Sequence, residues 1–93
     1  MPYRIEFKPS AAKALEALPR RDQRRLLAKI EALSVTPRPA GCEKLEGLPD
    51  LYRIRSGDYR IIYQIYDESL LVLIVRIGHR REVYRSSGSE AAC

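Results

Sequence analysis

The spacing of hydrophobic positions changes along the chain from a period of two to a helical period and back again. Residues 3–7 alternate apolar and polar side chains, which predicts a short first strand with one buried face. Apolar side chains then recur at helical spacing through residues 11–18, with Ser10 as the predicted N-cap. They recur again through residues 26–33, with Pro19 in the first turn of this second helix. The first third of the chain therefore predicts a strand followed by a helical hairpin.

The rest of the chain predicts three strands joined by tight turns. Residues 36–41, Thr-Pro-Arg-Pro-Ala-Gly, cannot continue a helix and begin a connector within the same domain. We predict strands over residues 51–55, 59–66 and 70–77. The last of these is apolar at every position from 70 to 75, which predicts a central strand covered on both faces. The order β-α-α-β-β-β predicts an α+β fold, with the helical hairpin packed on one face of a mainly antiparallel, four-stranded sheet.

The turn at Gly57 predicts the register of one strand pair and the face on which its arginines lie. A two-residue loop at Gly57 and Asp58, with glycine first as a type II′ turn prefers, pairs Arg55 with Arg60. Arg53 then falls beside them, so three arginines share one face. The same register matches apolar and aromatic partners on the opposite face, Ile54 with Ile61 and Tyr52 with Tyr63. Opposed like charges destabilise a sheet, so a visiting anion would explain them; protection of a sheet edge from aggregation is the alternative.

Length and composition limit the classes of function. Ninety-three residues form one small domain, which we place at residues 1–85, followed by a small, polar and flexible tail at 86–93. The longest apolar run is too short for a membrane helix, and the first residues lack the apolar stretch of a secretory signal. We therefore expect a cytoplasmic protein without a membrane partner. Cys42 and Cys93 have no metal-ligand spacing, so no metal site is expected.

The charge of the chain points to an anionic partner. The formal net charge is +5, and 13 of the 17 basic residues are arginines, whose planar fork matches phosphate. A charge of this size also serves solubility, which is the alternative. Basic residues gather along the second predicted helix, at Arg20, Arg21, Arg24, Arg25 and Lys29. They are candidate nucleic-acid contacts, and a solvated helix face is the competing interpretation.

A second basic segment follows the apolar strand at residues 76–85. Gly78 would allow a bulge that turns His79, Arg80 and Tyr84 toward the hairpin arginines. Parity cannot decide whether Arg80 or Arg81 points that way, because a bulge resets it. His79 is the only histidine in the chain. Imidazole side chains suit proton transfer near neutral pH, although a surface histidine without a catalytic role is the alternative.

Three strings occur together in this sequence: Lys-Leu-Glu-Gly-Leu-Pro at 44–49, Gly-Asp-Tyr-Arg-Ile-Ile-Tyr at 57–63, and Gly-His-Arg-Arg-Glu-Val-Tyr-Arg at 78–85. With them the chain resembles the RelE family of bacterial toxin–antitoxin toxins, over residues 3–85. The resemblance implies the fold predicted above and a toxin that cuts messenger RNA bound in the ribosomal A site. It also implies a cognate RelB-like antitoxin that keeps the toxin inactive until stress removes it. Operator DNA would be bound only through the antitoxin complex.

The resemblance also implies the site residues. It puts the catalytic cluster at Arg53, Arg55, Arg60, Arg80 and Tyr84. The implied reaction is attack of a ribose 2′-hydroxyl on the neighbouring phosphate, giving a 2′,3′-cyclic phosphate and a free 5′-hydroxyl without metal or cofactor. Arg60, with Arg53 or Arg55, would bind the phosphate, Arg80 would protonate the leaving oxygen, and Tyr84 would stack on a base or position the sugar. The basic helix, Arg81 and Arg85 would contact RNA or the ribosome.

The sequence departs from the family pattern at the proton acceptor. The best-known pattern has lysines at the positions of Arg53 and Arg55, and arginine cannot act as a base. His79, Glu46, Tyr84 and the RNA of the A site all stay open as acceptors.

Two other functions compete with this interpretation. A ParE-type toxin shares the fold but acts on DNA gyrase, and Arg60, Arg80 and Tyr84 argue against it. A catalytically silent module that binds nucleic acid, or represses its own operon with an antitoxin, is the third possibility.

Overall fold

The computed structural model describes residues 2–47 and 49–79. Four predicted site residues, Arg80, Arg81, Tyr84 and Arg85, and the predicted tail therefore lie outside the described residues. The elements follow in the order β1 (Arg4–Phe7), α1 (Pro9–Glu16), α2 (Arg20–Val35), β2 (Glu43–Lys44), β3 (Leu51–Ser56), β4 (Tyr59–Tyr66) and β5 (Leu71–His79). Neither α1 nor α2 is long and apolar enough to cross a membrane.

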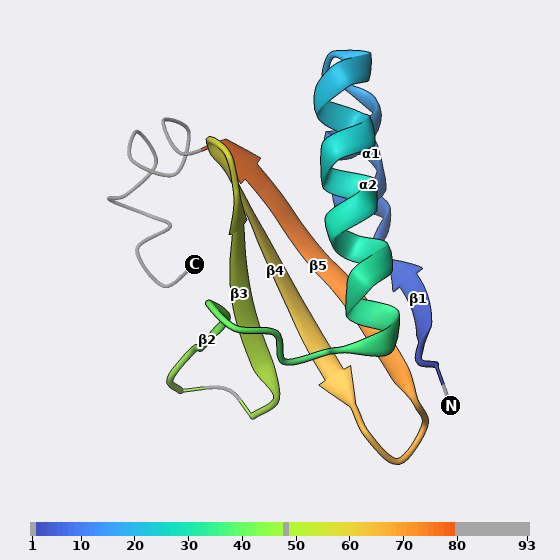
Figure 1. Ribbon diagram of the computed structural model, residues 1–93, viewed down its shortest axis with the longest axis vertical. Helices are drawn as coiled ribbons and strands as arrows, with labels where there is room; N and C mark the ends of the chain where they lie inside the picture. The colour runs from blue at the N-terminus through green and yellow to red at the C-terminus, as the bar shows by residue number, and fades with distance from the viewer. Residues whose placement is uncertain (1, 48, 80–93) are drawn as a thin grey trace.

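The strands form one mixed sheet in the order β1-β5-β4-β3-β2 (Figure 1). β1 runs parallel to β5, and the other neighbouring strands are antiparallel. The α+β fold predicted from the sequence is confirmed, but the sheet has five strands where we predicted four. The additional strand, β2, lies in the connector, where Glu43 pairs with Arg53 and Lys44 with Tyr52. Two residues are too few to show a hydrophobic period, which is why the pattern did not predict it.

Both helices pack on the same face of the sheet, and the core lies between the helices and that face (Figure 1). α2 contributes Leu26, Ile30 and Leu33, all with at most 1% of their surface exposed. Burying each of these side chains stabilises the fold by about 1.5–3 kcal/mol. The sheet side of this core is formed by Tyr52, Ile54, Ile61, Tyr63, Ile65, Val72, Ile74 and Ile77. We call the other face of the sheet, which neither helix covers, the open face.

The helices leave β5 fully buried on one face only. Val72 and Ile74 are 0% exposed on the helix side. Leu71, Leu73 and Val75 are half-buried. The prediction that this strand is covered on both faces was therefore wrong, because the unbroken apolar run reflected an internal strand between β1 and β4 rather than a second covering layer.

The helix starts also differ from the prediction. Lys8 is the N-cap of α1 and Pro9 begins the helix, so Ser10 lies within the first turn. Proline suits this first helical position because its missing N–H would have no partner there. Pro19 is the N-cap of α2 rather than part of its first turn, since its ψ of 149° is extended.

The predicted register of the β3–β4 hairpin is confirmed. Arg55 pairs with Arg60, Ile54 with Ile61 and Tyr52 with Tyr63. Gly57 has a φ of +62° while Asp58 is not among the residues with positive φ, the pattern of a type II′ turn. The β4–β5 turn is longer than the two residues predicted: Leu70 belongs to it, with a φ of +51°, and β5 begins at Leu71.

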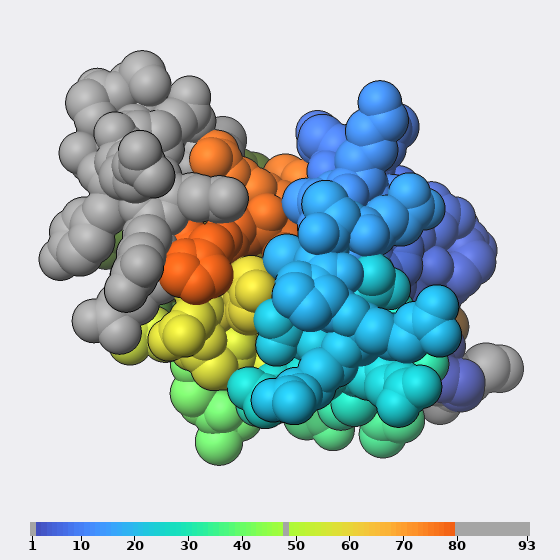
Figure 2. Space-filling view, turned by 90° about the horizontal axis from the view of Figure 1, so that it is seen from above, coloured from blue at the N-terminus to red at the C-terminus, as the bar shows by residue number. Residues whose placement is uncertain are grey.

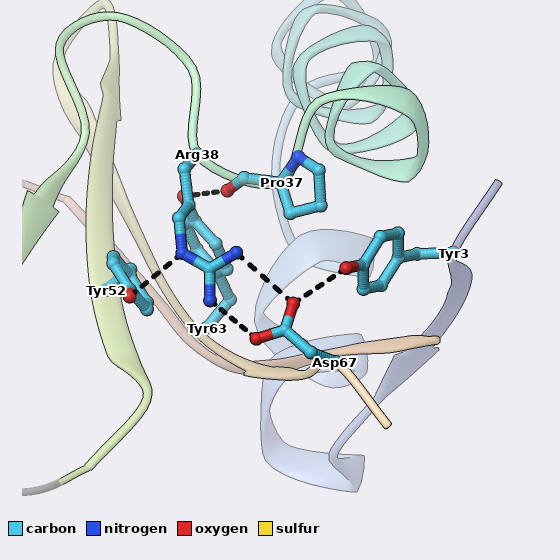
Figure 3. A network of polar contacts seen from close by, with 6 residues as sticks. All are labelled: Tyr3, Pro37, Arg38, Tyr52, Tyr63 and Asp67. Atoms are coloured by element: carbon cyan, nitrogen blue, oxygen red, sulfur yellow. Dashed lines mark hydrogen bonds and ion pairs between the residues drawn. The ribbon is translucent and has the colours of Figure 1, made fainter. Parts of the chain in front are cut away.

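A network of polar side chains closes the end of the sheet opposite the Gly57 turn (Figure 3). Arg38, in the connector after α2, donates to the Asp67 carboxylate at 2.8 Å and to the Tyr52 hydroxyl at 3.0 Å. Tyr3 donates to the same carboxylate at 2.7 Å. The hydrogen bond from Arg38 lowers the pKa of Asp67 most, and the hydrogen bond from Tyr3 lowers it further. The network therefore ties the connector and the start of the chain to the β4–β5 turn.

Candidate functional site

Three arginines lie together on the open face, as the register predicted. Arg53 and Arg55 come from β3 and Arg60 from β4, with Arg55 directly opposite Arg60. All three alternate with core residues such as Ile54 and Ile61, which fixes them on the side away from the helices. Arg53 and Arg60 are half-buried and Arg55 is exposed. We call these three residues the arginine face.

β5 adds a fourth arginine beside them. A register shift between Ile62 and Tyr63 leaves Val75 as an extra residue, so that Arg76 pairs with Ile62. Ile62 therefore has Arg53 on one side and Arg76 on the other. From the sequence, Arg76 was predicted only as the first residue of a basic segment. If Ile77 had been paired with Ile61 as a core partner, Arg76 would have been predicted on the arginine face.

Arg60 lies between Arg55 on β3 and Gly78 on β5. Gly78 has no side chain, so this residue of β5 places none beside Arg60 on that flank. The predicted role of Gly78 as the point of a bulge was wrong, because the register shift lies earlier in the strand, at Val75.

A carboxylate also reaches the arginine face. Glu43 lies opposite Arg53 across the β2–β3 pair. Its Oε1 accepts a hydrogen bond from Arg53 Nε at 3.0 Å and a second from Arg53 Nη2. This hydrogen bonding lowers the pKa of Glu43, and the nearby charges of Arg55 and Arg60 lower it further. Glu43 was not among the residues predicted for the site; Glu46, which was, is exposed three residues later.

His79 lies on the other side of the sheet from these arginines. It pairs with Tyr59, and the two rings meet edge to face with centroids 5.1 Å apart. Together they line a hollow of about 250 Å³ with Ala14 and Leu18 of α1. The structure therefore does not bring His79 to the arginine face. Because the bulge lies at Val75 and not at Gly78, His79 follows Ile77 by two residues and points to the same side of the sheet as the core.

The five basic residues predicted on the second helix are all exposed on α2: Arg20, Arg21, Arg24, Arg25 and Lys29. Arg25 Nη1 lies 3.0 Å from the position that a Cβ on Gly57 would occupy. Asp22 accepts a hydrogen bond from the Tyr59 hydroxyl at 3.0 Å. The start of α2 therefore lies against the β3–β4 turn, which joins Arg55 to Arg60 (Figure 2). Basic side chains thus surround this end of the molecule on two elements.

The described ranges contain no group of three or more His, Cys, Asp or Glu side chains that could hold a metal ion. The side chains of the arginine face are guanidinium groups, which bind anions, and Glu43 adds a carboxylate beside Arg53. The arrangement can stabilise negative charge on a phosphate and offers a group able to accept a proton.

Comparison with known proteins finds the same fold and similar sequences among toxins. The family model for the ParE toxin of type II toxin–antitoxin system, parDE, matches residues 5–84. The mRNA interferase toxin RelE of Escherichia coli (strain K12) is 35% identical, over 90% of this chain and 92% of its own length. Toxin RelG of Mycobacterium tuberculosis is 36% identical, over 91% of this chain and 99% of its own.

Solved structures agree with these sequence matches. The archaeal RelE–RelB complex from Pyrococcus horikoshii superposes with a TM-score of 0.77 at 36% identity, covering 86% of this chain and 97% of that one. The isolated E. coli RelE toxin gives a TM-score of 0.75 at 30% identity, covering 96% and 98%. The chain therefore belongs to the RelE/ParE family of toxins from type II toxin–antitoxin systems.

Proposed function

We propose that this toxin is an endoribonuclease that cleaves messenger RNA in the ribosomal A site and so inhibits translation. The observation that carries the proposal is the arginine face, where Arg55 and Arg60 are held directly opposite each other. Like charges in such a pair destabilise a sheet by a fraction of a kcal/mol, so folding alone gives no reason for them. Two relatives that carry the name mRNA interferase support the same reaction class.

The chemistry follows from the charges. The ribose 2′-oxygen attacks the adjacent phosphorus, the 2′-O–P bond forms, and the P–O5′ bond breaks to leave a 2′,3′-cyclic phosphate. Negative charge builds on the phosphoryl oxygens in the transition state, and fixed guanidinium groups stabilise it. In this proposal Arg60 and Arg55 bind that phosphate, and Arg53 and Arg76 lie beside them. Proton donation by Arg80 and stacking by Tyr84 complete the proposal from the sequence.

Antitoxin control is part of the same proposal. Solved relatives from Pyrococcus horikoshii and Mycobacterium tuberculosis are toxin–antitoxin complexes. We propose a RelB-like antitoxin as the partner of this chain, with operator DNA bound only through that complex. The ribosome and messenger RNA would be its cytoplasmic targets, and the basic residues of α2 with Arg81 and Arg85 would contact their phosphates.

The decisive experiment expresses the chain without an antitoxin and maps the 5′ ends of cellular transcripts. Cuts within translated codons, absent when translation is blocked, would support the proposal. The family description names ParE, so DNA breaks that depend on gyrase are the specific alternative outcome. Retained operator binding with an antitoxin, without any RNA cleavage on purified ribosomes, would instead indicate a silent module.

A further inference from the structure

The proposed cleavage needs a group that accepts the proton of the 2′-hydroxyl. Arginine stays protonated at any physiological pH, so the arginine face cannot supply one. His79 cannot reach it, since it packs with Tyr59 on the helix side of the sheet. Another group on the open face must take the proton, or the RNA itself must.

β2 brings a suitable group to that face. Glu43 lies opposite Arg53, and its side chain is 56% exposed, so RNA bound to the arginines can contact it. Both hydrogen bonds from Arg53 end on Oε1. Within residues 2–47 and 49–79, Oε2 accepts no hydrogen bond, and it is therefore available to a hydroxyl of the substrate. The two-residue strand β2 pairs with β3 and so holds the Glu43 carboxylate beside Arg53.

We propose, on the basis of the proposed function, that Glu43 is the general base of the cleavage. Oε2 takes the proton of the 2′-hydroxyl as the 2′-oxygen bonds to phosphorus. The electron pair of the breaking P–O5′ bond stays on the 5′-oxygen, which takes a proton from solvent water or from the predicted acid, Arg80. Arg53 bridges the two events, because its guanidinium contacts the carboxylate and adjoins the phosphate-binding arginines.

Ionisation of Glu43 fits this role. The neighbouring arginines lower its pKa, so the carboxylate is deprotonated throughout the physiological range. A phosphate that arrives at the arginine face competes for the same guanidinium groups. This competition weakens the hold of Arg53 on the carboxylate and raises its basicity at the moment when the proton must be taken.

A purely structural role for Glu43 predicts different behaviour. If it only positioned Arg53, its loss would weaken the binding of the substrate phosphate. Removing a negative charge beside three arginines should by electrostatics alone leave RNA binding unchanged or strengthen it. The rate of the chemical step and the affinity for substrate therefore separate the two roles.

The test compares wild type with Glu43→Gln, which keeps the size of the side chain, and with Glu43→Asp, which keeps the charge. Glu68→Gln, in the exposed β4–β5 turn, is the control for the same chemical change. Single-turnover cleavage is followed from pH 5.5 to 9 in pre-bound ribosome–mRNA complexes, with binding and thermal melting measured in parallel.

We expect Glu43→Gln to slow cleavage by ~10²-fold or more, the usual contribution of a positioned base, while it binds as tightly as wild type. The wild-type rate should be flat over this pH range. The residual rate of Glu43→Gln should rise about tenfold per pH unit, because hydroxide then takes the proton. Glu43→Asp should keep the flat profile at a reduced rate.

Glu43→Gln cleaving at the wild-type rate would overturn the inference while leaving the proposed function intact. A loss of rate explained by weaker binding or by lower thermal stability would overturn it in favour of the structural role. A wild-type protein that does not cleave ribosome-bound mRNA would instead overturn the proposed function, and this inference with it.

Discussion

Replacement of Arg60 by alanine separates the stability of this fold from its activity. Arg60 faces Arg55 across the hairpin and is half-buried. Removing it relieves a repulsion of about 0.2–1 kcal/mol and loses a similar contribution from packing of the side-chain stem. The two effects offset each other, so the free energy of unfolding should change by less than ~1 kcal/mol. In a domain of this size that corresponds to a shift of the melting temperature of at most about 4–8 °C.

The effect of Arg60→Ala on cleavage should be much larger. Loss of one fixed donor to a charged transition state typically costs ~10²–10³ in rate, which should abolish toxicity in a growth assay. Two controls frame the result. Arg4→Ala removes an exposed arginine that pairs with Glu6 at the far strand and should change neither property. Ile61→Ala empties a site that is 0% exposed and should cost about 2–5 kcal/mol of stability.

Melting, growth inhibition and single-turnover cleavage of the same variants provide the comparison. A variant lacking Arg60 that remained toxic would contradict its role in phosphate binding. If it melted as early as Ile61→Ala, the arginine would be part of the framework of the fold, and the argument from opposed charges would be wrong.

The basic helix, His79 and Asp67 can each be tested separately. Affinity for the ribosome should fall steeply with salt, and charge reversal at Arg24 and Arg25 should flatten that slope; salt-independent binding would mean that α2 only presents a solvated face. His79→Gln should leave single-turnover rates between pH 5 and 9 close to wild type, and loss of an imidazole-like limb would contradict the placement of His79. Asp67 has a lowered pKa from Arg38, so its contribution to stability is present above the ordinary carboxyl pKa and lost as pH falls through the lowered value. Urea unfolding from pH 2.5 to 7 should show that Asp67→Asn removes this acid-dependent part.

Much of the hairpin could be predicted from sequence because two local signals agreed there. The turn chemistry of Gly57 and the alternation of polar and apolar residues each imply the same register. A shift of the β3–β4 register by one residue would have put Arg60 in the core beside Ile54, where burial of its charge would cost much free energy. The register of a strand pair can be predicted where every other register would bury a charged side chain.

Prediction was weaker where position depends on distant segments. β2 has only two residues, and its pairing with β3 follows from where the connector returns after α2, so Glu43 could not be placed on the arginine face. The orientation of His79 depends on the bulge at Val75, which the apolar run around it does not reveal. The two misses share one cause, since neither feature leaves a periodic pattern in the chain.

The parallel pairing of β1 with β5 has a consequence for when this protein can become active. Arg4 pairs with Leu71, so β1, which is synthesised before the other described strands, has as its strand neighbour in the described sheet β5, which is synthesised after them. Contacts between segments so distant in sequence form slowly, because a long loop must close before they are gained. A nascent chain therefore cannot complete its sheet while β5 is still within the ribosome that makes it. We expect toxicity to begin only after β5 has left the ribosome, which gives a co-synthesised antitoxin time to bind before the fold is complete.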